Sequence, residues 1–347
     1  MRDDRFDYDD TARTRDFILG KLREQGRSEG KVREGVTIGS GLGGFAVDHM
    51  GASTKETPHP ENGPVEISYQ EIFRMLNRVE GRTPIELLKD HVPGHAQKLI
   101  IGNLMETPED DLVMAQSGRE HPYQGVDLKR ATFWIRVMQL MKAEAWIGSN
   151  ASGILTPNTL RAPSILLVDS TLDLTSQTPL LGVNDERFGP HFPHKSDLYT
   201  ASRIDAFEEA ARQLGIQVNR GTYLRAMGPD YESPEQVYLF RNMLRALWEE
   251  AGAQPGENRF KGEVTGAVGM SSTYEALAAR HAQLSQKNPA FENGLSLLSV
   301  ATNYSASAGP NGFVKPSNHE EVKQEAAAVQ KDFGLLVREG ILRTRAQ

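Results

Sequence analysis

The chain lacks cysteine altogether, and it has neither an excess of basic residues nor a long apolar run. Without cysteine it can form no disulfide, no cysteine-ligated zinc site and no catalytic thiolate. The formal net charge of -7 does not favour binding to nucleic acid or to an anionic membrane surface. No stretch approaches the ~20 apolar residues that span a bilayer, and the N-terminal sequence MRDDRFDYDDTARTRD lacks the apolar core of a signal peptide. We therefore expect a cytoplasmic protein that binds neither nucleic acid nor a membrane.

What is present indicates a globular chain of alternating strands and helices. Hydrophobic residues make up 38% and charged residues 24% of the 347 residues, enough to bury a large core. Short apolar runs predict strands at 36–38, 98–101, 112–115, 145–147, 164–168, 218–225, 265–268 and 296–302. Helical spacing of apolar residues predicts helices at 10–25, 127–143, 201–214, 234–250, from 272 onward, and 317–338. A helical pattern at 71–90 is interrupted by Gly81 and Pro84. This alternation predicts an α/β fold, a single domain whose central, mostly parallel or mixed β-sheet is flanked by helices.

The sequence GSGLGG at 39–44 follows the first predicted strand and is a candidate binding loop. It formally matches the dinucleotide fingerprint G-x-G-x-x-G, which also needs a continuing helix and an acidic residue about 20 residues further on. Here the chain soon reaches Gly51 and a loop rich in proline and histidine, and Glu66 has the wrong context. A tight turn without a ligand is one alternative. The other is an anion nest, in which backbone N–H groups and the Ser40 hydroxyl hold phosphate.

Three further predicted strands end in segments that can meet an anion. Arg119 and His121 lie in GREHPYQG at 118–125, where arginine offers a planar fork that suits phosphate and histidine a second donor. The small residues GSNASG at 148–153 can offer backbone amides or form a simple turn. Ser271 can cap the helix that follows it, bind a ligand, or do both. Open α/β sheets bind ligands at strand ends, although surface positions remain the alternative for Arg119 and His121.

Taken jointly, these motifs resemble those of the trimeric purine nucleoside phosphorylase family in order and spacing. The motifs are GSGLGG at 39–44, VPGHAQKL at 92–99, GREHPYQG at 118–125, NDERFG at 184–189, GTYLRAMGPDYES at 221–233, AVGMSS at 267–272, ATN at 301–303 and NHEEV at 318–322. The similarity implies a homotrimer, and a single phosphorylase-like α/β domain over 36–347. Residues 1–35 are then an N-terminal extension with a helix. The stretches near 51–90 and 253–261 are insertions that elaborate the surface or pack an oligomer.

The resemblance also implies a role for each site residue. Phosphate would be bound by Ser40, His95, Arg119, His121, the backbone of Ala151, and Ser271. Ribose would contact Tyr123, Tyr223, Met270 and His319. The base would lie against Tyr231, with Glu232 and Asn303 at its edge, and the catalytic residues would be Asn303, His121 and Glu232. No metal and no organic cofactor is implied, and inorganic phosphate is the co-substrate.

The implied reaction is phosphorolysis of 6-oxopurine (deoxy)ribonucleosides such as inosine and guanosine, giving the free purine and (deoxy)ribose 1-phosphate. A Glu232 carboxylate can accept N1–H of hypoxanthine or guanine, whereas adenine has no N1 proton and would leave it unsatisfied. Asn303 can bond N7 and O6, which matters most as the purine leaves and N7 takes up a proton. Bound phosphate would stabilise the oxocarbenium-like sugar and then attack C1′.

Three departures from the family pattern keep alternatives open. Gln124 stands where the family often has glutamate, Tyr304 stands where mammalian relatives carry lysine, and the segment 173–178 is shorter than in relatives whose phenylalanine reaches the neighbouring subunit's ribose pocket. One alternative is a methylthioadenosine phosphorylase, which tends to have aspartate in place of Asn303. Another is a catalytically inactive nucleoside-binding relative. A metal-dependent hydrolase would need an aspartate cluster that the sequence does not show, and an NAD-dependent oxidoreductase explains the glycine loop alone.

Overall fold

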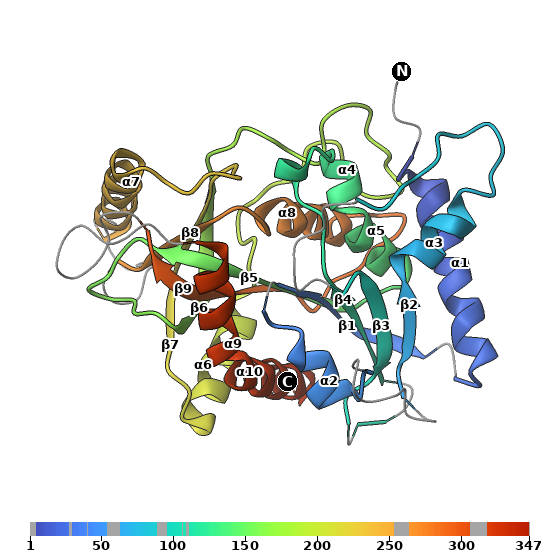
Figure 1. The fold of residues 1–347 in the computed structure, drawn as a ribbon, viewed down its shortest axis with the longest axis horizontal. Helices are drawn as coiled ribbons and strands as arrows, with labels where there is room; N and C mark the ends of the chain where they lie inside the picture. Colours follow the sequence, from blue (N-terminus) through green and yellow to red (C-terminus); the bar gives the residue numbers. More distant parts are fainter. Residues whose placement is uncertain are drawn as a thin grey trace.

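One β-sheet passes through the middle of the domain, and helices cover both of its faces (Figure 1). The computed structural model describes residues 5–27, 30–39, 41–53, 63–88, 96–105, 107–108, 111–252, 264–305 and 318–346. Its strands are β1 (Lys31–Ile38), β2 (Val65–Ser68), β3 (Lys98–Asn103), β4 (Asp111–Ser117), β5 (Ala145–Ile154), β6 (Ser164–Asp173), β7 (Val218–Arg225), β8 (Gly266–Gly269) and β9 (Leu295–Tyr304). Its helices are α1 (Tyr8–Glu24), α2 (Gly44–Met50), α3 (Tyr69–Leu76), α4 (Leu128–Ala131), α5 (Phe133–Leu140), α6 (Ala201–Leu214), α7 (Pro234–Gly252), α8 (Thr273–Gln283), α9 (His319–Ala328) and α10 (Gln330–Ala346), with a 3₁₀ turn η1 (Pro122–Gln124). The predicted α/β fold with a helix-flanked sheet is confirmed.

The sheet is mixed, and part of it closes on itself. The strand order is β2-β3-β4-β1-β5-β8-β7-β6-β9, and β9 pairs with β5 as well as with β6. Strands β5, β8, β7, β6 and β9 therefore form a closed ring, to which β1, β4, β3 and β2 add an open extension. Pairing is parallel around β1 and between β5 and β9, and antiparallel at β2–β3, β3–β4, β5–β8 and β6–β9. The closure brings segments that follow β7 and β8 close to β5 and β9.

The helices bury their apolar faces against this sheet and against one another. Helix α1 packs on α5 and α3, α8 packs on α5 and β5, and α10 packs on α6 and α2. In α1 the buried Ile18 and Leu22 are one helical turn apart, as the predicted periodicity requires. Its first turn is capped by Asp7, whose side chain accepts a hydrogen bond from the Asp10 N–H at 2.9 Å. The N-terminal helix is thus integrated into the core of the domain.

A buried ion pair ties β1 to α6. Both guanidinium NH₂ groups of Arg203 donate to the Glu34 carboxylate at 3.0–3.1 Å, and Arg203 Nε donates to Ser296 Oγ at 3.0 Å. Glu34 and Arg203 are each only 2% exposed. Such a pair is costly to break from one side, because the remaining charge stays buried without its partner.

Several predicted boundaries differ from the structure. Strand β1 begins at Lys31, before the expected domain start at residue 36. The segment 148–153 is not a loop after the strand, because β5 continues to Ile154 and pairs with β9 on one side and β8 on the other. Among the described residues of 71–90, helical structure is limited to α3, which ends at Leu76, and the strand β2 before it was not predicted. The expected insertion at 253–261 lies outside the described residues.

Two expected helices are each divided in the structure. The helix predicted at 127–143 breaks at Thr132, whose hydroxyl donates to the Leu128 carbonyl at 2.7 Å. The C-terminal helix predicted at 317–338 is α9 followed by α10, with Val329 between them.

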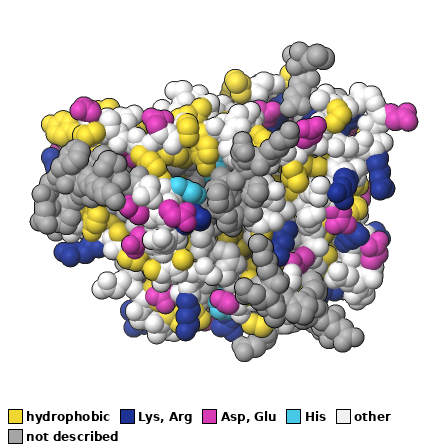
Figure 2. All heavy atoms as spheres, in the orientation of Figure 1, with side chains coloured by type: hydrophobic (Ala, Val, Ile, Leu, Met, Phe, Trp, Pro, Cys, Tyr) yellow, Lys and Arg dark blue, Asp and Glu magenta, His cyan; other side chains and the backbone are white. Residues whose placement is uncertain are grey.

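The surface drawn in Figure 2 shows Lys and Arg side chains interspersed with Asp and Glu. Within the described part of the chain, no helix is both long enough and apolar enough to cross a membrane.

Candidate active site

A cavity of about 460 Å³ collects residues from separate strand ends of the sheet. The residues that line it and that the sequence singled out are Arg119, His121, Tyr123, Ala151, Tyr231, Glu232, Met270, Ser271, Asn303 and His319. They come from the segments after β4, β7 and β8, from within β5 and β9, and from the start of α9. The structure therefore brings together residues that are far apart in the sequence, as the strand-end argument predicts.

Arg119 lines this cavity and is only 4% exposed. Its Nη1 donates to Glu275 Oε2 at 2.9 Å, and its Nη2 donates to the Ser149 carbonyl at 2.6 Å. Burial acts most strongly on the pKa of Arg119 and lowers it, but the Glu275 carboxylate and the neighbouring tyrosine hydroxyls together hold that pKa above the ordinary value. Arg119 is therefore a fixed positive charge in the wall of the cavity.

His121 and Tyr123 form the next part of the wall. Their rings stack at 4.8 Å between centroids, and His121 is 5% exposed. Gln124 Oε1 accepts the His121 backbone N–H at 2.8 Å, so the glutamine holds the backbone of the η1 turn. Burial raises the pKa of Tyr123 to about 12, which keeps its phenol neutral near pH 7.

The wall of the cavity also carries a carboxylate and an amide. Glu232 is partly buried, and this burial raises the pKa of its carboxyl above the ordinary glutamate value. Asn303 lies near the end of β9 beside Gly153 of β5, and its Oδ1 accepts from Thr302 Oγ1 at 2.9 Å. Tyr231 lies at the rim and is 42% exposed. These residues offer an aromatic face together with groups that can read the edge of a planar heterocycle.

Tyr223 and Ser271 differ in part from what the sequence suggested. Tyr223 is fully buried and is not among the described residues that line the cavity. Its hydroxyl lies behind the wall and accepts the Ser271 N–H at 3.3 Å. Ser271 lines the cavity but does not cap α8, because the N-cap position is Ser272 and its side chain makes no capping hydrogen bond.

His319 is placed at the cavity by the start of α9. Asn318 is the N-cap of this helix, and its Oδ1 accepts the Glu321 N–H at 2.9 Å. His319 is the first residue of the helix, and its position is therefore set by the cap. Ser40 and His95, the two remaining predicted phosphate residues, lie outside the described residues.

The first glycine of GSGLGG has a packing reason for being glycine. A Cβ at Gly39 would lie 2.8 Å from the Asn150 Cα and 2.9 Å from the Ser149 carbonyl oxygen. The Gly39 N–H donates to Ser149 Oγ at 2.9 Å. The close approach therefore locks the end of β1 to the part of β5 whose carbonyl holds Arg119.

We expect Gly39→Ala to lower the free energy of unfolding by about 1–3 kcal/mol, because backbone atoms of β5 must move to admit the methyl group. Thermal or urea denaturation measures the change. Gly43→Ala is the matched control, since no atom lies within 4 Å of a Cβ there and the backbone at Gly43 is right-handed helical. Equal stability of the two variants would contradict the packing argument.

Sequence reasoning missed the layer behind Arg119. Glu275 is fully buried, and Ser272 accepts hydrogen bonds from Asn150 Nδ2 at 2.9 Å and from Arg119 Nη1 at 3.3 Å. The one local signal was the pattern Ser272-Thr273-Tyr274-Glu275, which resembles a capping box and indicates a helix start rather than a site.

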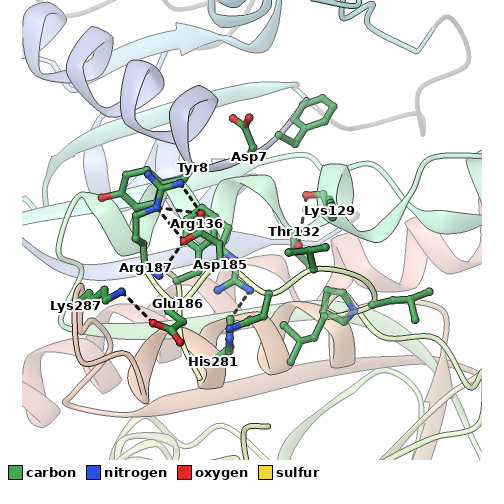
Figure 3. A pocket seen from close by; sticks show the side chains of 17 residues that line it. Asp7, Tyr8, Lys129, Thr132, Arg136, Asp185, Glu186, Arg187, His281 and Lys287 are labelled. Atoms are coloured by element: carbon green, nitrogen blue, oxygen red, sulfur yellow. Dashed lines mark hydrogen bonds and ion pairs between the residues drawn. The ribbon is translucent and has the colours of Figure 1, made fainter. Parts of the chain in front are cut away.

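A second cavity, of about 520 Å³, lies beside the N-terminal segment and the ends of α5 and α8 (Figure 3). Its wall includes most of the motif NDERFG at 184–189. Many of its charged groups pair with one another, as Arg187 does with Asp185 at 2.6 Å and Lys287 with Glu186 at 3.1 Å. Arg136 contacts His281 Nδ1 at 2.9 Å and thereby joins α5 to α8. We therefore interpret NDERFG as a packing motif and the first cavity as the candidate active site.

Comparison with known proteins identifies the family to which the chain is similar. A family model described as the phosphorylase superfamily matches residues 76–341. Purine nucleoside phosphorylase 1 of Bacillus subtilis (strain 168) is 30% identical over 304 residues, covering 88% of this chain and 89% of that protein. Purine nucleoside phosphorylase of Rattus norvegicus is 30% identical over 333 residues, covering 94% and 92%. The solved structure of Schistosoma mansoni purine nucleoside phosphorylase in complex with adenosine has a TM-score of 0.70 at 24% identity, covers 97% of this chain and 98% of that chain, and shares the fold.

The region that matches the family model contains the strands and loops that form the first cavity. The fold and this match together define the class of protein as an α/β phosphorylase. The chain belongs to the purine nucleoside phosphorylase family of the phosphorylase superfamily. It is accordingly a pentosyltransferase enzyme, and its class of reaction is nucleoside phosphorolysis.

Proposed function

We propose that the enzyme cleaves 6-oxopurine ribonucleosides and deoxyribonucleosides, with inosine and guanosine as substrates and inorganic phosphate as co-substrate. The observation that supports this most strongly is that one cavity wall contains both anion donors, Arg119, His121 and Ser271, and groups that can read a base, Glu232 and Asn303. An anion and a purine can then lie on opposite sides of the sugar. The products are the free purine and (deoxy)ribose 1-phosphate.

Phosphate binds at the end formed by Arg119, His121, Ser271 and the backbone of Ala151 in this proposal. These donors are held before the substrate arrives, because β4, β5 and β8 fix the segments that carry them. As the glycosidic bond stretches, positive charge develops at C1′, and the bound phosphate stabilises that charge before it attacks. Met270, Tyr123 and His319 then surround the ribose, while Tyr223 supports Ser271 from behind. The site has no role for an organic cofactor or a metal ion in this proposal.

The base end selects 6-oxopurines in this proposal. Ionised Glu232 accepts N1–H, a proton that adenine lacks, and Asn303 bonds N7 and O6 as negative charge builds on the leaving base. A buried carboxylate that faces a lone pair is left unsatisfied, so the wrong base loses more than one hydrogen bond. The test is the release of hypoxanthine from inosine against the release of adenine from adenosine, both in excess phosphate. A clear preference for inosine supports the proposal, and a preference for adenosine would overturn the roles of Glu232 and Asn303.

Activity is expected to fall on the acid side at a higher pH than an ordinary glutamate would give. Burial raises the pKa of Glu232, and only its ionised form accepts N1–H, so activity rises as pH increases through that raised pKa. The measurement is kcat/KM for inosine against pH. Glu232→Gln should lack this acid limb and have a lower plateau. An acid limb that persists unchanged in Glu232→Gln would remove Glu232 from base recognition.

A homotrimer completes the proposal. Leu181, Val183 and Phe192 are 79%, 76% and 88% exposed in the segment that follows β6. Apolar side chains in this number on one loop support a contact between subunits.

A further inference from the structure

Arg119 is held from two sides before any substrate binds. The Ser149 carbonyl of β5 accepts from Nη2, and the Glu275 carboxylate of α8 accepts from Nη1 at 2.9 Å. Ser272, directly before α8, adds a longer contact at 3.3 Å. A planar guanidinium with contacts on both of its terminal nitrogens has little freedom to rotate.

Ser272 itself is fixed in an uncommon conformation. Its φ of 71° lies in the left-handed region, which serine rarely adopts. Its hydroxyl accepts from Asn150 Nδ2 at 2.9 Å, and Asn150 Oδ1 accepts from Ser299 Oγ at 2.5 Å. A chain of hydrogen bonds thus runs from β9 through β5 to the start of α8, and it determines where Glu275 meets Arg119.

The opposite charges of Arg119 and Glu275 both act on an anion in the cavity. Glu275 is fully buried and Arg119 is 4% exposed, so water screens neither charge well. Arg119 lines the cavity, whereas Glu275 lies behind it. An anion that approaches Arg119 is therefore attracted by the guanidinium and repelled by the carboxylate behind it.

We infer that Glu275 is a positioning residue for phosphate: it aligns the Arg119 guanidinium and also limits how tightly the anion binds. This inference rests on the phosphate role of Arg119 proposed above. Alignment requires the hydrogen bond, whereas the limit on affinity requires the negative charge. Two substitutions separate these requirements, because glutamine keeps an acceptor oxygen at the same distance without the charge, and aspartate keeps the charge on a shorter side chain.

Glu275→Gln is expected to lower the KM for phosphate by about tenfold, because it removes a poorly screened repulsion while the acceptor for Nη1 remains. Glu275→Asp is expected to raise the KM for phosphate about fivefold, because its oxygen withdraws from Nη1. The KM for inosine should change little in both variants. Initial rates measured over a range of phosphate at saturating inosine give these values. A purely structural role would lower kcat in both variants and leave the KM for phosphate unchanged.

Thermal denaturation provides a readout independent of activity. In Glu275→Gln the Arg119 charge is buried without its partner, so phosphate should raise Tm by more than it does in the wild type. Glu34→Gln is the matched control, since it breaks an equally buried Glu–Arg pair whose members do not line the cavity. It should lower Tm without changing the effect of phosphate.

The outcomes distinguish this inference from the proposed function. A wild-type enzyme that releases purine without any need for phosphate would overturn both. If the wild type requires phosphate but neither Glu275→Gln nor Glu275→Asp changes the KM for phosphate, only the role of Glu275 would be overturned. If Glu275→Gln fails to fold even in phosphate, the decision rests on Glu275→Asp, and an unchanged KM for phosphate in that variant would count against the inference.

Discussion

Arg119→Met should reduce kcat/KM for phosphate by about 10²–10³-fold, the usual loss when a pre-positioned donor to a reacting anion is removed. Arg119 is a buried cation that lines the cavity and that we propose binds phosphate, and methionine fills the volume of its stem without supplying donors or charge. The effect should fall on phosphate, because the base end is built from other segments. Steady-state rates at varied phosphate and saturating inosine measure it, and an unaltered phosphate dependence would remove Arg119 from the pocket.

A double variant separates this catalytic effect from a loss of stability. Arg119→Met alone leaves the Glu275 carboxylate buried without its cation, which destabilises the fold. Adding Glu275→Gln removes that charge. The double variant should therefore regain much of the lost Tm while its phosphate dependence stays impaired. Recovery of activity together with stability would show that Arg119 acts only as a structural residue.

Asn303→Asp should shift selectivity between inosine and adenosine by about 10²-fold toward adenosine. The carboxylate can accept from the 6-amino group of adenine, whereas it repels O6 of hypoxanthine. The measurement is the ratio of kcat/KM values for the two nucleosides in excess phosphate. Asn242→Asp is the matched control, since Asn242 lies in α7, bonds the Tyr238 carbonyl, and is not among the cavity residues described. An unchanged ratio in Asn303→Asp would mean that Asn303 does not read the base.

Where local pattern and tertiary packing agree, the sequence predicted the element itself. Helix α6 at 201–214 and strand β7 at 218–225 have the predicted bounds. The spacing of apolar residues marks both elements, and the left-handed C-cap at Gly215 marks the end of the helix. The failures have tertiary causes. The small residues at 148–153 resemble a loop, yet β5 continues through them because β9 pairs along the whole segment and β8 joins at Gly153. Strand β2 has no continuous apolar run, since Glu66 separates Val65 from Ile67, and it forms by antiparallel pairing with β3.

In the candidate site, too, some residues could be predicted from local sequence patterns, whereas others are set by tertiary packing. Residues after predicted strands, such as Arg119 and Ser271, could be assigned to one site because strand ends converge, and the resemblance added the base end. Glu275 could not be found in this way. Its contact with Arg119 spans 156 positions of sequence, and its local pattern indicates a helix cap. Tyr223 was predicted as a ribose neighbour from its motif, and only the three-dimensional packing shows that it lies behind Ser271.

The central claim is that phosphate, and not water, is the nucleophile. The direct measurement is the release of hypoxanthine from inosine, with ribose 1-phosphate quantified, in the presence and in the absence of inorganic phosphate. We predict release only when phosphate is present, with one ribose 1-phosphate formed for each hypoxanthine. Equal release without phosphate, with free ribose as the second product, would contradict the account and indicate a hydrolase.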